Sequence, residues 1–147
     1  MVNLSLFGER LSDLMIEVNI KSEELGKKIG VSGSAVRRWQ RGNGIINLTN
    51  LIALADHFGC AVDYLAGRGS IDNDEVFTPK TLPPFPQRLR EVMQEKGMTR
   101  YSMDQDTKFK DCYFTRWDNG TIPLLTNVIE LADLFDCTID YLIGRET

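Results

Sequence analysis

Six basic side chains lie close together in the first half of the chain. They fall within residues 21–45, where the only acidic residues are Glu23 and Glu24, so this basic segment has a net charge of +4; they are Lys21, Lys27, Lys28, Arg37, Arg38 and Arg41. Lysine and arginine displace the counterions that surround phosphates, and helix N-termini offer free N–H groups to phosphate oxygens. The segment therefore has the chemistry to bind a polyanion, although most charge runs are simply solvated surface.

The overall composition hides this segment. The chain has 147 residues, of which 42% are apolar and 26% are charged, and its net charge is −4. Residues 1–70 sum to +1 and residues 71–147 to −5. The composition is typical of one ordinary globular domain or two very small ones, and local charge says more about partners than the total does.

Several classes of function lack the residues they need. His57 is the single histidine, and the three cysteines have no CxxC spacing. No glycine-rich phosphate motif or hydrolase elbow occurs, so we expect no enzyme, no metal and no cofactor. No apolar run reaches the ~18 residues of a membrane helix, and no signal peptide is visible, so we expect a cytoplasmic protein without membrane contact.

The chain repeats itself. Residues 38–42 return as 116–120 at a shift of 78, and residues 54–68 return as 131–145 at a shift of 77. Self-similarity at this period indicates two copies of one unit. We predict domains at 1–68 and 85–147.

The segment between the two copies, residues 69–84, has the composition of a linker. It begins with Gly and Ser, continues with an acidic cluster and ends in Pro83-Pro84, which favours a semi-stiff extended spacer. The alternative is a packing arm in which Ile71, Val76 and Phe77 contact a neighbouring surface.

Each copy has the apolar spacing of helices and no strand pattern, so the predicted fold class is all-α. In the first copy we predict helices over 22–29 and 32–41, with Gly30 at the turn between them. Gly26 supplies the small residue that two closely crossing helices need, and Val36 points inward. A short helix, a tight turn and a second short helix form a helix-turn-helix.

This ordered series of residues resembles the Cro and phage-repressor type of helix-turn-helix domain, often called XRE-like. The residues that carry the resemblance are Leu25, Gly30, Val31, Ser32, Val36, Trp39, Gly42, Leu51, Ala55, Phe58, Asp63, Tyr64, Leu65 and Gly67. The resemblance implies two tandem five-helix, lambda-repressor-like domains, the second divergent. It also implies a third helix that reads the DNA major groove, and a homodimer on two half-sites.

The resemblance also implies roles for individual residues of the first copy. It places base-reading positions at Ser32, Gly33, Ser34, Arg37 and Arg38. Phosphate-binding positions are implied at Lys21, Ser22, Arg41 and Asn43. Arg38 has three open alternatives: a bidentate contact to guanine, a phosphate contact, or an ion pair with Glu23 or Glu24.

The second copy differs where DNA would be read. Residues 49–68 and 126–145 share 13 of 20 residues, whereas 21–37 and 99–115 share none at a shift of 78. Asp104 replaces Gly26 at the helix crossing, where an unpaired carboxylate would be costly to bury. Three roles stay open: a second half-site bound through Arg100, Lys110 and Arg116, a dimerisation or partner surface, or a structural companion. We favour the partner surface.

The sequence therefore predicts a sequence-specific DNA-binding transcriptional regulator, with repression as the expected sign. Its partner would be double-stranded DNA, and the sequence does not indicate any small-molecule effector. The alternative is a protein-interaction module, such as an antitoxin, adaptor or anti-repressor, on a helix-turn-helix scaffold.

Overall fold

The computed structural model describes residues 4–42, 45–68 and 77–146. The first unit consists of five helices: α1 (Ser5–Glu17), α2 (Ser22–Ile29), α3 (Gly33–Gln40), α4 (Leu48–Phe58) and α5 (Val62–Leu65). The second unit repeats them as α6 (Phe85–Glu95), α7 (Arg100–Asp106), α8 (Asp111–Asp118), α9 (Leu125–Phe135) and α10 (Ile139–Leu142). The described part of the chain contains no β-strand, so the predicted all-α class is confirmed.

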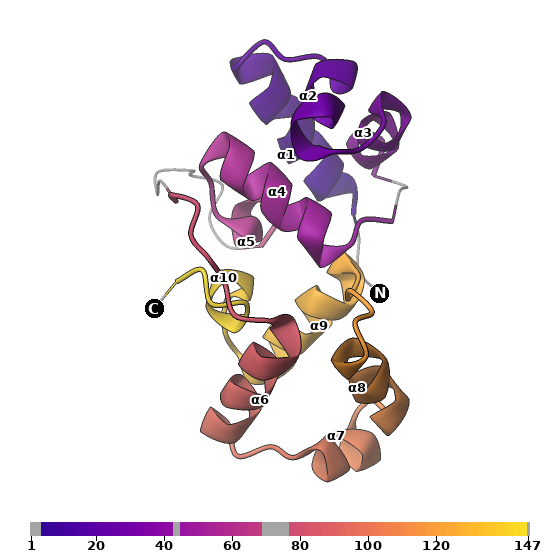
Figure 1. Ribbon diagram of the computed structural model, residues 1–147, viewed down its shortest axis with the longest axis vertical. Coiled ribbons are helices and arrows are strands. Elements are labelled where there is room, and N and C mark those ends of the chain that lie inside the picture. Colours follow the sequence, from indigo (N-terminus) through magenta and orange to yellow (C-terminus); the bar gives the residue numbers. More distant parts are fainter. Residues whose placement is uncertain (1–3, 43–44, 69–76, 147) are drawn as a thin grey trace.

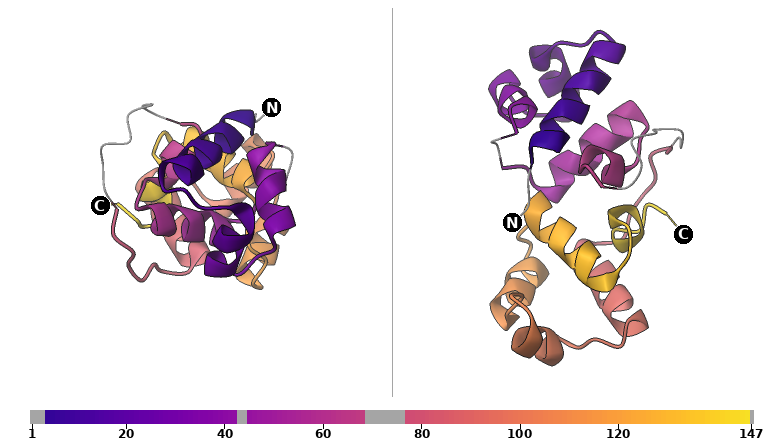
Figure 2. Two further views of the ribbon diagram at one scale, coloured as in Figure 1. Left: turned by 90° about the horizontal axis from the view of Figure 1, so that it is seen from above. Right: turned by 180° about the vertical axis from the view of Figure 1, so that it is seen from behind.

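The two units lie end to end along the long axis of the molecule (Figure 1). Helices α2 and α3 of the first unit lie at one end, and α7 lies at the other. Helices α4, α5, α9 and α10 meet in the middle, as the view from behind also shows (Figure 2). The centre of the molecule is therefore built from the part of the repeat that is most alike in sequence.

Local signals in the sequence set the helix boundaries. Ser32 precedes α3, and its side chain accepts a hydrogen bond of 3.1 Å from the amide of Ala35, as an N-cap residue does. Gly30 ends α2 with a φ of +86°, a left-handed conformation that glycine adopts without strain. The predicted boundaries of α2 therefore agree with the structure, and α3 agrees to within a residue at each end.

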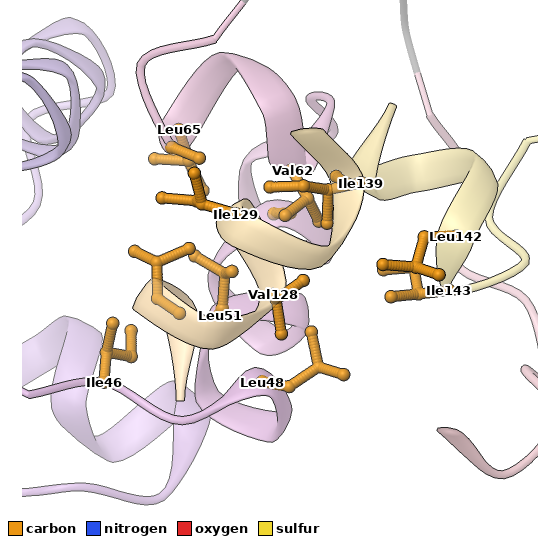
Figure 3. Close-up of a cluster of buried hydrophobic side chains, with 14 of the residues drawn as sticks. Ile46, Leu48, Leu51, Val62, Leu65, Val128, Ile129, Ile139, Leu142 and Ile143 are labelled. Carbon is orange, nitrogen blue, oxygen red and sulfur yellow. The ribbon is translucent and has the colours of Figure 1, made fainter. Parts of the chain in front are cut away.

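The two units share one hydrophobic core (Figure 3). The first unit contributes buried side chains from α4 and α5 and from the segment that precedes α4: Ile46, Leu48, Leu51, Val62 and Leu65. The second unit contributes Val128, Ile129, Ile139, Leu142 and Ile143. Because these side chains are at most 7% exposed, separating the units would expose a large apolar surface to water.

Two aspartates at the centre each cap the short helix of the other unit. The carboxylate of Asp140 accepts hydrogen bonds from the amides of Val62 and Asp63, at 3.1 and 3.0 Å. The carboxylate of Asp63 accepts hydrogen bonds from the amides of Ile139 and Asp140, both at 3.0 Å. This reciprocal pattern is that of an isologous, two-fold-related interface, formed here between two halves of one chain.

Two arginines extend the same symmetry. Arg145 pairs with Asp140 of its own unit at 2.6 Å and with Asp56 of the first unit at 2.9 Å. Arg68 pairs with Asp63 of its own unit and, at 2.9 Å, with Asp133 of the second unit. Every one of these partners belongs to the 20-residue segment that the two copies share.

The chain outside the helices adds further contacts between the units. The amide of Leu48 donates to the carbonyl of Pro123, and the amide of Leu125 donates to the carbonyl of Ile46, both at 2.9 Å. Phe77 lies under the guanidinium of Arg145, 4.9 Å from it, so this residue of the predicted linker packs as the alternative interpretation expected. Ile71 and Val76 lie outside the described residues.

Candidate nucleic-acid interface

Helices α2 and α3 cross closely at Gly26. A Cβ atom at this position would lie 2.5 Å from the carbonyl oxygen of Val31, which is closer than real Cβ contacts allow. Leu25 and Val36 are fully buried beneath the turn, and Trp39 is 3% exposed. The close crossing at Gly26 and the inward position of Val36 that the sequence predicts are confirmed, and α3 is held with its other face toward solvent.

Three small residues form the start of that exposed face. Ser32 is exposed and caps α3, while Gly33 is half-buried beside the side chain of Glu23. A Cβ atom on Gly33 would lie 2.9 Å from the Glu23 carboxylate. Ser34 is exposed and accepts a hydrogen bond from Arg37 at 3.2 Å. The beginning of α3 is therefore narrow and polar, as an element that enters a groove ~12 Å wide must be.

Arg37 links α3 to α2. Its guanidinium pairs with the carboxylate of Glu23 and donates to the hydroxyl of Ser22 at 3.0 Å. The same guanidinium lowers the pKa of the Glu23 carboxyl below its ordinary value. Both side chains remain largely exposed, so this is a surface ion pair that an incoming phosphate can compete for.

Arg38 is the arginine of α3 that has no partner within the described part of the chain. The sequence left open an ion pair between Arg38 and Glu23 or Glu24, but Arg37 holds Glu23 instead, and Arg38 has no hydrogen bond or ion pair to any other described residue. Lys21 and Arg41 are exposed and equally without such partners among the described residues. These three cations are available to an external anion, whereas the predicted phosphate contact Asn43 lies outside the described residues.

The helix crossing of the second unit differs from that of the first, because an aspartate stands in place of Gly26. Asp104 does not carry an unpaired carboxylate, because Oδ1 accepts a hydrogen bond of 2.8 Å from the amide of Asp111, the first residue of α8. The side chain is also only half-buried. The carboxylate that replaces Gly26 thus caps the following helix, where a negative charge meets the positive end of the helix dipole.

Arg100, one of the predicted DNA contacts of the second unit, forms ion pairs with acidic side chains. Its guanidinium pairs with Asp111 at 2.9 Å and with Asp118 at 3.3 Å, and it also lies over the ring of Phe114. Asp118 in turn pairs with Arg90 at 3.0 Å. The charges of Arg100 and Asp111 therefore compensate each other within the protein, which reduces both the attraction and the repulsion expected toward phosphate.

Arg116 is the exposed cation of α8 that no carboxylate pairs with among the described residues. Its guanidinium lies 5.1 Å from the ring centre of Tyr113 and 4.0 Å from the sulfur of Cys112. Tyr113 is half-buried and packs on Phe109 and Trp117, so its ring belongs to the packing of the unit. The ammonium of Lys110 donates to a backbone carbonyl at 2.5 Å and is exposed.

Among residues 4–42, 45–68 and 77–146, no group of three or more His, Cys, Asp and Glu side chains is arranged to hold a metal ion. No helix in that part of the chain is long and apolar enough to cross a membrane.

Each half of the molecule thus presents a short helix, a tight turn and an outward-facing second helix, which places the protein in the helix-turn-helix class. Comparison with protein families agrees: residues 11–65 match the model described as helix-turn-helix, and residues 88–147 match the Cro/C1-type HTH DNA-binding domain. The chain belongs to the Cro/C1-type helix-turn-helix family and carries two such domains in tandem.

Two relatives of this chain are phage repressors by name. The repressor protein C2 of Salmonella phage P22 is 38% identical over 64 residues, which is 44% of this chain and 30% of that protein. The cryptic phage CTXphi transcriptional repressor RstR of Vibrio cholerae serotype O1 is 27% identical over 67 residues, 46% of this chain and 60% of that protein. This chain therefore matches between about a third and about three fifths of the length of these two relatives.

Among solved structures, the P22 c2 repressor protein in complex with a synthetic operator is 38% identical. The match covers 41% of this chain and 91% of that chain, with a TM-score of 0.40.

Proposed function

We propose that the protein is a sequence-specific regulator of transcription that binds double-stranded DNA, with α3 in the major groove. The observation that carries the proposal is the position of three exposed cations, without ion-pair partners among the described residues, around the exposed face of α3: Arg38 on the helix, Arg41 at its end and Lys21 before α2. Phosphate contacts from the ends of both helices would fix the position of α3, and side chains on its exposed face would read bases.

The named relatives support the biological role. Both are phage repressors by name, so we propose repression, in which the bound protein covers a promoter. No catalytic step is required for that role. A reporter gene placed behind the selected binding site would show lower expression when the protein is present.

The direct test has two stages. Sequences bound by the intact chain are first selected from random DNA, and binding to the selected site is then measured by fluorescence anisotropy at ~50 and ~200 mM salt. If about three phosphates are neutralised, the affinity should fall roughly 40-fold between these concentrations.

Two variants separate the expected roles. Arg41→Ala should weaken binding to all sequences and reduce the salt slope by about one. Arg38→Ala should reduce the affinity for the selected site, relative to the affinity for random DNA, by roughly 5- to 150-fold. The reason is that a bidentate arginine–guanine contact is worth about 1–3 kcal/mol of discrimination. Lys80→Ala is the matched control, because it removes an exposed positive charge outside both helix-turn-helix units. Unchanged binding by the double variant Arg37→Ala/Arg38→Ala would contradict the proposal.

A further inference from the structure

The exposed helices of the two units, α3 and α8, lie on the same side of the molecule. Both lie on the right of Figure 1, one above the other along the long axis. The view from behind places both on the left, and the view from above again shows them on one side (Figure 2). The arrangement follows from the two-fold-like contacts at the centre, which leave α3 and α8 in equivalent places.

The interface at the centre, which sets this arrangement, is buried, and its polar side chains are hydrogen-bonded. Asp140 is 1% exposed and Asp63 is 9% exposed, and each caps the short helix of the other unit. Within the described residues, no buried side-chain nitrogen or oxygen lacks a hydrogen-bond partner. A fully satisfied buried network of this kind favours one relative placement of the units, because any other placement would leave buried charges unpaired.

The two outward helices carry the same arginine in different surroundings. Arg38 and Arg116 occupy the same position of the repeat, and both are exposed without a carboxylate partner among the described residues. The start of each helix differs: Gly33 and Ser34 in α3 correspond to Asp111 and Cys112 in α8. The two helices are placed equivalently but carry different side chains. They therefore present one shared arginine and several different groups to a ligand.

We propose that a single chain binds an asymmetric operator, with α3 in one major groove and α8 in the next groove on the same face of the duplex. The inference rests on the proposed function and extends it to the second unit. Helices in successive major grooves are about one turn, ~34 Å, apart. Arg38 and Arg116 each read a guanine, while the differing helix starts make the two half-sites unlike. The homodimer expected from the sequence is then not needed, because the second reading helix is supplied within the chain.

The test uses the intact chain and the DNA selected for it. The selected sequences should contain two unlike elements, with centres about ten base pairs apart, and native mass spectrometry should show one chain per duplex. Arg38→Ala and Arg116→Ala should each reduce affinity roughly 5- to 150-fold, each at its own element. Inserting five base pairs between the elements turns one of them to the opposite face, and should reduce binding to that of one element alone.

Control variants keep the outcome interpretable. Lys80→Ala should bind like the unaltered protein, and circular dichroism should show that the arginine variants remain folded, as their exposed positions imply. Two chains on a palindrome, or full binding by Arg116→Ala with loss by Arg38→Ala, would overturn the inference and leave the proposed function standing. Full binding by Arg38→Ala with loss by Arg116→Ala, or no selected DNA at all, would overturn the proposed function itself.

Discussion

Removing the carboxylate of Asp140 should destabilise the whole molecule. This carboxylate accepts hydrogen bonds from the amides of Val62 and Asp63 at 3.1 and 3.0 Å, and it pairs with Arg145 at 2.6 Å. Asp140→Ala leaves two buried amides without their acceptor. It also leaves the buried guanidinium of Arg145 with Asp56 and one backbone carbonyl as its remaining hydrogen-bonding partners in the described segments.

The magnitude follows from these contacts. Breaking a buried ion pair by removing one partner costs about 3–5 kcal/mol, and each unsatisfied buried group costs about 1–3 kcal/mol. The two costs overlap, so we expect a loss of about 4 kcal/mol in the free energy of unfolding. With a urea m-value of about 2 kcal/mol/M, the unfolding midpoint should fall by about 2 M.

Urea unfolding followed by circular dichroism measures this loss. Asp140→Asn keeps one oxygen acceptor and should lose less than Asp140→Ala. Asp106→Ala removes an exposed carboxylate at the end of α7 and should change the free energy of unfolding by no more than about 0.5 kcal/mol. A loss below about 1 kcal/mol for Asp140→Ala would refute the reasoning that the reciprocal caps hold the two units together.

Three further predictions concern other parts of the molecule. Gly26→Ala places a methyl group 2.5 Å from the carbonyl oxygen of Val31, so urea unfolding should show a loss of about 1–3 kcal/mol; unchanged stability would mean that the helices can separate without cost. Burial raises the pKa of the Cys60 thiol to about 12, so iodoacetamide at pH 8 should modify the exposed Cys112 first, and Cys60 should react only after unfolding. Equal rates would contradict the buried position of Cys60. Burial, followed by the neighbouring side-chain carboxyl of Asp140, raises the pKa of Asp63 to about 6 from an ordinary 3.8, so the folded state binds this proton more tightly than the unfolded chain does. The stabilising contribution of Asp63 should then be full below pH 4 and be lost as the pH rises through 6, and the difference in unfolding free energy between pH 5 and pH 7 should shrink in Asp63→Asn.

The sequence predicts the helices well because their signals are local. Ser32, Gly30 and the apolar spacing each act within one or two turns of the chain, and they place α2 and α3 to within a residue. The inward position of Trp39 follows from its spacing with Val36 in the same way. Such features need no knowledge of the rest of the fold.

Contacts between distant segments were harder to predict. The sequence indicates that a carboxylate at Asp104 would need a partner, but it does not show that this partner is the amide of Asp111. Arg37 and Arg38 are neighbours with the same side chain, and sequence spacing alone did not determine which of them pairs with Glu23.

The sequence contained a signal for the central interface, but the meaning of this signal is clear only from the contacts between the two units. Residues 49–68 and 126–145 share 13 of 20 residues, including Asp63 with its counterpart Asp140 and Arg68 with its counterpart Arg145. An interface between two similar halves uses the same residues twice, because each contact has a counterpart across the two-fold axis. Similarity concentrated in one part of a repeat is thus consistent with the copies packing together there.

The central claim is that the exposed face of α3 contacts DNA, and an NMR titration tests it most directly. Amide chemical shifts of the isotopically labelled intact chain would be recorded as its selected operator is added. We predict that the largest changes occur from Ser32 to Arg41, with a second set from Lys110 to Arg116 if α8 contacts the adjacent half-site. Changes confined to α1 and α6, with the amides of α3 unaffected, would contradict the claim.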